Sequence, residues 1–433
     1  MADLVLKNGK IVTPDGIVEG DLFIEGGKII AIGGSQAGGV SAKKELDCTG
    51  RYILPGAIDV HVHFREPPPD SPKADWNTES HAAAAGGITT VFDMPNTSPS
   101  TTTVEALEEK RAIANAKSVV NFRLYMGLTD DNLEEIKKAP RDIAGVKVYM
   151  GASTGDLLVQ DLDIIEKLLE FTVQENVPWP VVVHAENEAI LRQHAENIRK
   201  YGSVDDPAVH SLLRPPLAAY QAVRDILHLA KKHSARVHIT HASTAMELEE
   251  IEKFKSPRIS CDTTPHHLFL GLDKYAILGN FVRVNPPLRG EHDRAALWGA
   301  LQPDSGLIDL IATDHAPHTK AEKEKTYLDA PSGIPEVQTM LPLLLDVVSH
   351  GQLSLHDVIR LTSSAPARLF NLPSKGSIEV GKDADLVIVD MEKTQELTEE
   401  MLLYKCKWSP YTGWHLTGWP VTTIIGGKIS FSS

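Results

Sequence analysis

Residues Ala57–His63 read Ala-Ile-Asp-Val-His-Val-His, an apolar and β-rich run that ends in two histidines. Seven similar runs follow along the chain, with helical stretches between them. We predict strands at Ala57–His63, Thr89–Met94, Asn121–Met126, Gly145–Met150, Pro180–His184, Arg236–His241, Arg258–Thr263 and Leu307–Asp314. The predicted helices include Thr103–Ala116, Leu162–Glu175, Ala218–Lys232 and Thr244–Phe254. Eight strand–helix units in series predict an α/β fold, a TIM-like (β/α)8 barrel.

The two ends of the chain resemble each other in pattern. Leu4–Val12 predicts a hairpin around Asn8-Gly9, and Asp21–Ile32 predicts another around two glycines. Ala384–Asp390 predicts a strand and Thr422–Phe431 a third hairpin. Short hairpins bury little apolar surface alone, so we expect one small β-sandwich domain formed by both termini. The predicted parts are residues 1–54 and 375–433 for this domain and 55–374 for the barrel.

The composition narrows the class of protein. A chain of 433 residues with 42% hydrophobic and 23% charged residues is typical of a globular protein, and it has no run long enough to cross a membrane. The net charge of −15 argues against nucleic acid or an anionic membrane as partner, although not against an anionic small molecule. Cys48, Cys261 and Cys406 are too few for a disulfide framework, and no secretory signal is recognisable. We therefore expect buried thiols and a cytoplasmic location.

Polar side chains end five of the predicted strands. The carboxyl ends of barrel strands meet at one rim, where the active sites of such barrels lie. Residues i and i+2 of a strand point to the same face, so both histidines of the first run can reach one ion. The residues at this rim that are metal ligands, or can become ligands, are His61, His63, Lys147, His184, His241 and Asp314.

Each of these residues also has a structural interpretation. The chain has 18 histidines, and a lone histidine at a strand end is more often a hydrogen-bonded core or surface residue. His238 lies three residues before His241, so we expect it to face the helices. We interpret His194, His228 and His233 as surface or packing residues. Lys147 is unusual, because a lysine on a buried strand costs free energy unless it is paired or neutral.

Several motifs together resemble a known family. The chain is similar to the dihydroorotases, which belong to the cyclic amidase branch of the amidohydrolase superfamily. His-x-His alone indicates only the superfamily, whereas Phe-Arg-Glu-Pro with Met-Pro-Asn-Thr narrows it. The motifs that carry the resemblance are Asp59–Pro67, Asp93–Thr97, Lys147–Gly151, Asn285–Arg289, Ala312–His318 and Tyr404–Pro410.

The resemblance implies a pair of divalent metal ions, with zinc as the ion that such ligands favour. His61, His63 and Asp314 match the ligands of one ion, and His184 and His241 match those of the other. Lys147 matches a lysine that CO2 converts to a carboxylate bridging both ions. Two adjacent ions lower the pKa of water between them. The resemblance thus implies a hydroxide that attacks the ring amide of dihydroorotate, with Asp314 as the proton shuttle, and the reverse closure of N-carbamoyl-L-aspartate in pyrimidine (UMP) synthesis.

The resemblance also implies the contacts with the substrate. Arg65, Asn96 and His318 match residues that hold its carboxylate, and Asn285 matches a contact with the ring. In the structural interpretation, Arg65 pairs with the neighbouring Glu66 at the surface, and Asn96 shapes a turn without contacting the substrate. The family usually has a glycine after Glu-Pro, whereas here the proline-rich stretch Pro67–Trp76 stands in its place and is one residue longer. We therefore expect this loop to follow its own path.

Other functions remain open at this point. An allantoinase or a hydantoinase (dihydropyrimidinase) would have the same metal site, but its substrates lack the ring carboxylate that Arg65 and Asn96 would bind. A non-catalytic scaffold subunit would be expected to lose metal ligands, whereas this chain has all six. The expected partner is a small-molecule substrate, and a homodimer is the assembly we consider. His315, His266 and His267 are expected to be structural or to support the ligands.

Overall fold

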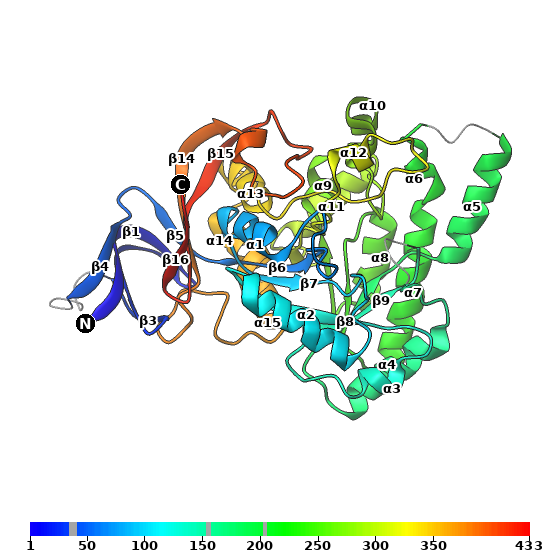
Figure 1. The fold of residues 1–433 in the computed structure, drawn as a ribbon, viewed down its shortest axis with the longest axis horizontal. Coiled ribbons are helices and arrows are strands. Elements are labelled where there is room, and N and C mark those ends of the chain that lie inside the picture. The colour runs from blue at the N-terminus through cyan, green and yellow to red at the C-terminus, as the bar shows by residue number, and fades with distance from the viewer. Residues whose placement is uncertain (34–40, 153–156, 202–205) are drawn as a thin grey trace.

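The computed structural model describes residues 1–33, 41–152, 157–201 and 206–433. Eight parallel strands form the central sheet in sequential order (Figure 1). They are β6 (Ala57–Val62), β7 (Ile88–Asp93), β8 (Asn121–Gly127), β9 (Gly145–Tyr149), β10 (Val181–His184), β11 (Val237–Ile239), β12 (Ile259–Thr263) and β13 (Leu310–Ile311). A parallel bridge between Val62 and His315 joins the first strand to the segment after the last. The predicted (β/α)8 barrel is therefore confirmed, although β13 is much shorter than predicted.

Helices surround this sheet and begin at polar caps that the sequence supplies. The Thr103 side chain accepts a hydrogen bond from Ala106 N, and the Thr244 side chain accepts one from Glu247 N. The longer helices are α1 (Trp76–Ala85), α2 (Val104–Lys117), α4 (Leu162–Gln174), α5 (Glu188–Tyr201), α7 (Pro216–His233), α8 (Ala245–Phe254), α11 (Glu291–Leu301) and α13 (Met340–Ser349). The shorter ones are α3 (Leu133–Ile136), α6 (Val209–Leu213), α9 (Pro265–Phe269), α10 (Tyr275–Leu278), α12 (Lys320–Lys323), α14 (Leu355–Ile359) and α15 (Ala365–Leu369). The four helices predicted by range are confirmed as α2, α4, α7 and α8. None of the described helices has the length and apolar character of a membrane span.

Phe370, which follows α15, closes the amino-terminal end of the barrel. Its ring lies 5.3 Å from Phe92 and 5.3 Å from His238. Arg123, near the start of β8, and Arg236, just before β11, donate hydrogen bonds to the carbonyls of Phe370 and Leu369. These contacts fix α15 across the ends of the strands, so the barrel is a filled core at this end.

His238 does not face the helices, and that expectation is wrong. It is in register with Val182, which packs inside the barrel with Tyr125, whereas the alternate residue Val183 belongs to the cluster that the helices cover. The reason is that β11 ends at Ile239 and His241 has φ 42°, so the alternation that the expectation relied on stops between the two histidines.

The two ends of the chain form a second sheet, as predicted, and its blue and red strands lie side by side in Figure 1. Its order is β16 (Lys428–Ser432), β15 (His415–Ile425), β14 (Leu386–Glu396), β5 (Tyr52–Pro55), β1 (Ala2–Thr13), β2 (Gly16–Glu25) and β3 (Lys28–Ile32), with β4 (Ala42–Asp47) paired to β1. Side chains from both termini share one apolar cluster, for example Leu6, Ile53, Ile388 and Ile424. The hairpins around Gly26-Gly27 and Gly426-Gly427 are confirmed.

The predicted hairpin at Asn8-Gly9 is wrong. Residues 2–13 form one strand, and the register with β2 shifts between Leu6 and Gly9. Asn8 has φ 58°, but its N–H is bonded to the Asp21 carboxylate across the strand pair. The left-handed residue therefore makes a bulge here and not a turn.

Candidate metal centre and substrate cavity

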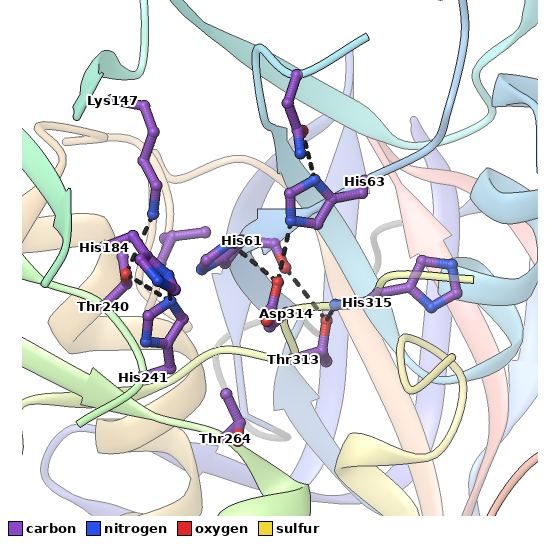
Figure 2. Close-up of polar contacts among 12 residues, drawn as sticks. His61, His63, Lys147, His184, Thr240, His241, Thr264, Thr313, Asp314 and His315 are labelled. Carbon is purple, nitrogen blue, oxygen red and sulfur yellow. Dashed lines mark hydrogen bonds and ion pairs between the residues drawn. The ribbon is translucent and has the colours of Figure 1, made fainter. Parts of the chain in front are cut away.

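One group of ligand-type residues lies where β6 and β13 end. His61 is in β6 and His63 directly follows that strand, while Asp314 follows β13 with φ 49°. Nε2 of His61 and Nε2 of His63 each lie 3.0 Å from Oδ1 of Asp314. Figure 2 shows the three side chains converging from two elements that are far apart in the sequence. Their ligand atoms all lie within 4.8 Å of one another, which suits one metal ion.

A second group lies beside the first, at the ends of β9, β10 and β11. Nδ1 of His184 is 3.0 Å from Nε2 of His241, and Lys147 Nζ is 3.1 Å from Thr240 Oγ1. The His241 ring lies 5.5 Å from the His61 ring, so the two groups are neighbours. The structure thus brings together all six residues that the sequence predicted for the metal site (Figure 2).

Burial sets the protonation of these side chains. Loss of hydration lowers the pKa of His61 to about 4 and holds the pKa of His241 well below its ordinary value. Burial alone would raise the pKa of Asp314, but contacts with His61 and His63 outweigh it and lower this pKa. Neutral imidazoles beside a carboxylate are the forms that bind a divalent ion. Burial also lowers the pKa of Lys147 to about 7, so a large share of its amine is uncharged at neutral pH.

The donor atoms fit a divalent metal. Two neutral imidazole nitrogens 3.0 Å apart, as in His184 and His241, have the spacing of two ligands of one ion as well as that of a hydrogen bond. His61 and His241 each keep a buried Nδ1 that has no hydrogen-bond partner in the part of the chain that the structure describes. A set of four histidines, one carboxylate and one lysine that can become a carboxylate supplies the nitrogen and oxygen ligands that zinc prefers.

Residues behind the ligands hold them in place, and the sequence analysis missed most of these. Glu186 accepts from Nε2 of His184 at 3.0 Å and also binds the Arg214 guanidinium. Asp262 accepts the His241 N–H at 2.5 Å. Such partners orient metal ligands. Glu186 lies two residues after His184, so its position in the sequence could have indicated this contact. Asp262 is close to His241 only in the folded barrel, and no sequence pattern indicates it.

Three other histidines near the rim have structural partners. His315 Nε2 lies 2.8 Å from Glu79, and its Nδ1 accepts the N–H of Glu336 at 3.0 Å. His266 Nδ1 lies 2.8 Å from a Glu336 oxygen, and His267 Nε2 donates to the Pro286 carbonyl at 3.0 Å. These contacts fit a structural role, which is one of the two roles expected for these histidines from the sequence.

A cavity beside the candidate metal ligands contains three of the four predicted substrate contacts. Its lining residues are His63, Arg65, Asn96, Asn285, Asp314, Ala316, Ser332 and Gly333. His63 Nδ1 donates to Asn96 Oδ1 at 2.7 Å, so Asn96 has a role beyond shaping a turn. Asn285 Oδ1 accepts from His210 Nε2 at 2.9 Å. We call this space the substrate cavity.

His318, the fourth predicted contact, lies behind Arg65 and does not line the substrate cavity. Its Nε2 is 3.2 Å from Arg65 Nη2 and 3.1 Å from the Ser332 carbonyl oxygen. Burial lowers the pKa of His318 to about 3, so the ring is neutral and adds no charge beside the guanidinium. His318 is therefore placed to orient Arg65.

Arg65 does not pair with Glu66. Glu66 is buried and binds Lys117 and the N–H of Trp76, at the start of α1. Arg65 has φ 61°, which turns the two successive side chains in different directions. The Arg65 guanidinium has no carboxylate within ion-pair distance among the residues described, and its Nε is buried without a partner there. The long proline loop thus leaves the arginine in the cavity.

Lys323 supports the wall of the substrate cavity, which no sequence pattern indicated. Its buried Nζ donates to the carbonyls of Pro331 at 2.9 Å and Gly333 at 3.0 Å, and to that of Arg283 at 3.3 Å. Gly333 has φ 144°, and a Cβ there would lie 2.3 Å from the Ala316 oxygen. The wall is therefore a tightly packed backbone held by the hydrogen bonds of one buried lysine side chain.

Comparison with known proteins agrees with this geometry. A model of the amidohydrolase family matches residues 52–430. The dihydroorotase of Methanothermobacter thermautotrophicus is 37% identical and that of Methanosarcina mazei 39% identical, each alignment covering 99% of this chain and 94% of the relative. The structure of L-hydantoinase (dihydropyrimidinase) from Arthrobacter aurescens superposes with a TM-score of 0.91 at 32% identity, covering 99% of this chain and 96% of that one. The chain belongs to the amidohydrolase family.

Proposed function

We propose that the chain is a dihydroorotase, which reversibly hydrolyses the ring amide of dihydroorotate to N-carbamoyl-L-aspartate. The proposal rests on two levels of support. The barrel fold and the family membership indicate the class of enzyme, a hydrolase of cyclic amides. The substrate cavity then selects the substrate within that class.

The proposed metal ligands fall into two sets. His61, His63 and Asp314 would hold one divalent ion, and His184 and His241 the other. Lys147, with an amine that is partly neutral, would react with CO2 and become the bridging carboxylate. Zinc is the proposed ion, and when bound it would polarise the amide carbonyl and lower the pKa of water toward neutrality.

Asp314 is the proposed proton shuttle. Its lowered pKa keeps it a carboxylate at neutral pH, so it can take a proton from the attacking water. The same oxygen can then deliver that proton to the departing ring nitrogen, because it lies at the edge of the substrate cavity. One carboxylate thereby serves first as base and then as acid.

The observation that carries the substrate assignment is Arg65, which lines the substrate cavity and has no acidic partner among the described residues. A guanidinium without an acidic partner is costly to desolvate unless an anion joins it, and its two-pronged geometry suits a carboxylate. Dihydroorotate carries a ring carboxylate, whereas hydantoin and allantoin do not. The high TM-score to a hydantoinase reflects the barrel, which both kinds of enzyme would share, and does not bear on Arg65.

A substrate panel tests the assignment. The zinc-loaded protein is assayed with dihydroorotate, N-carbamoyl-L-aspartate, hydantoin, dihydrouracil and allantoin. We expect turnover of the first two and little of the others. Arg65→Met should remove the preference for dihydroorotate over dihydrouracil, which has the same ring without the carboxylate. Efficient hydrolysis of hydantoin or allantoin with no dihydroorotate turnover would show that the assignment is wrong.

A further inference from the structure

A second hollow, of about 290 Å³, opens on the same rim of the barrel outside the substrate cavity. Its described lining comes only from segments that follow the carboxyl ends of strands. Ala152 follows β9, the residues from Glu188 to Arg214 follow β10, Arg283 follows β12, and Tyr327 follows β13. We call this hollow the arginine cleft.

The arginine cleft is positively charged, although the chain as a whole carries −15. Its described lining contains four arginines, whereas Glu188 is the one acidic residue in it. Arg192 and Arg199 are exposed on α5, and Arg192 Nε lies 2.8 Å from Glu188. A local cluster of cations in a concave surface raises the concentration of anions there, whatever the net charge of the molecule.

The inner arginines are fixed to the walls. The Arg283 guanidinium lies 4.3 Å from the centre of the Tyr327 ring and donates to the Ala330 carbonyl at 2.5 Å. Arg214 donates from Nε to both oxygens of Glu186 at 3.1 Å. The cleft therefore has a preorganised inner end and a cationic mouth formed by two exposed arginines.

The inner end of the cleft touches both parts of the candidate active site. Nδ1 of His210 lies 2.8 Å from the Tyr327 hydroxyl, and its Nε2 donates to Asn285, which lines the substrate cavity. On the other side, Glu186 joins Arg214 to His184. Hydrogen bonds thus connect the lining of the cleft to the lining of the substrate cavity and to a candidate metal ligand.

We propose that the arginine cleft captures the open-chain dicarboxylate before it enters the substrate cavity. The inference rests on the proposed function, because N-carbamoyl-L-aspartate carries two ionised carboxylates at neutral pH and dihydroorotate only one. A dianion is repelled by a protein of strongly negative net charge, so ring closure needs a cationic entrance more than ring opening does. Arg192 and Arg199 supply that entrance.

The test compares two double variants that each remove two positive charges. Arg192→Gln with Arg199→Gln alters the mouth of the cleft. Arg258→Gln with Arg368→Gln is the matched control, because both arginines are exposed and lie at the amino-terminal end of the barrel, beside β12 and in α15. Steady-state kinetics in both directions are measured at about 20 mM and about 500 mM sodium chloride, since salt screens such attraction.

At low salt the cleft variant should lose about three- to tenfold in kcat/KM for ring closure, mainly through KM, and less for ring opening. High salt should abolish its difference from the control variant. An equal loss in both variants at low salt would overturn the proposal. Calorimetry with succinate, a dicarboxylate without an amide, gives an independent readout, and the cleft variant should bind it more weakly than the control does.

The two proposals fail in different ways. If the wild-type protein turns over neither substrate but binds succinate in a cleft-dependent manner, dihydroorotase is the wrong function and the anion cleft stands. If the wild type turns over both substrates and the cleft variant matches the control in kinetics and calorimetry, the cleft proposal alone is wrong. Succinate binding that does not depend on Arg192 and Arg199 counts against the cleft in either case.

Discussion

The same eight strands form both ends of the barrel, but the two ends satisfy their polar groups differently. His238 and His241 lie three residues apart and both point into the barrel. Each ring nitrogen of His238 has a partner at 2.8 Å, Ser260 on one side and Asp262 on the other. Nδ1 of His241 is buried with no partner in the described structure, and its Nε2 faces another histidine. One imidazole completes a packed core, and the other is available to a ligand.

The backbone shows the same contrast. Arg65, His241 and Asp314 all have positive φ, and all lie at the carboxyl-terminal rim. A left-handed conformation costs a non-glycine residue on the order of 1–3 kcal/mol and is usual at functional sites. At the other end, Asn176, Ser234 and Asn371 also have positive φ, but they lie where α4, α7 and α15 end, which is a common place for a left-handed residue. The comparison teaches that the rim is organised around a ligand and the amino-terminal end around stability.

The strongest test of this contrast is Asp314→Asn at the rim. An amide cannot accept the proton of water, so kcat for dihydroorotate should fall by at least about 1,000-fold. The variant should still fold and bind metal through the remaining ligands. Kinetics, metal content and thermal unfolding are measured on the same preparation. Retention of more than a tenth of the wild-type kcat would exclude Asp314 as the proton shuttle.

Glu186→Gln changes the residue that accepts a hydrogen bond from the candidate metal ligand His184. Loss of the charge that orients His184 should lower zinc affinity about 10- to 100-fold, measured by competition with a chelator. Glu166→Gln is a matched control, because Glu166 also pairs with a histidine, His233, at 2.6 Å, but on the surface. The control should retain wild-type affinity. Equal effects of the two variants would mean that Glu186 does not act through the metal site.

Phe370→Ala probes the opposite end of the barrel. Removing this buried ring should destabilise the protein by about 3 kcal/mol, because it leaves a cavity against Phe92 and His238. The kcat of the folded fraction should stay within about twofold of wild type, since the amino-terminal end of such a barrel serves stability and the active site lies at the other end. Denaturant unfolding and kinetics below the transition check both parts. A large loss of kcat with unchanged stability would contradict the assignment of stability to the amino-terminal end and catalysis to the rim.

The smallest effect is expected outside the barrel, in the sheet formed by the two termini. Asp383 precedes β14, and burial would raise its pKa, but hydrogen bonds from Lys28, Ser374 and Lys375 outweigh this and lower the pKa to about 2. A carboxylate with a lowered pKa stabilises the folded state fully at pH values above its pKa in the unfolded chain, near 3.8. This stabilisation is lost as the pH falls toward the folded-state pKa of about 2.

Asp383→Asn should therefore be slightly less stable than wild type at about pH 6, and the difference should shrink between about pH 4 and pH 2. Urea unfolding at several pH values measures it. A difference that grows in acid would contradict the sign. Asp390→Asn, within β14, is the control, because the hydrogen bonds that Asp390 accepts among the described contacts come from backbone N–H groups and not from lysine side chains.

Much of the candidate site could be predicted because barrel chemistry is local in the sequence. His61, His63 and His184 end strands whose apolar runs are plain to read, and strand ends of a barrel share one rim. The expected orientation of His238 is wrong because it assumes that side chains alternate as far as His241. The alternation holds only within the strand. Only the coordinates reveal that β11 stops at Ile239.

The sequence by itself determined the eight-stranded barrel, the joining of the two termini and the six candidate ligand positions, because periodicity and strand-end chemistry are properties of short segments. The tertiary structure decided which polar groups remain without partners. It showed that Glu66 pairs with Lys117 and leaves Arg65 in the substrate cavity, and that Lys323 holds the cavity wall. It also showed that two arginines of α5, one that follows α6 and one that follows β12 line one cleft. Hydrogen bonds and ion pairs of this kind join residues that lie far apart in the chain, so they depend on distances in the folded protein and no local sequence pattern encodes them.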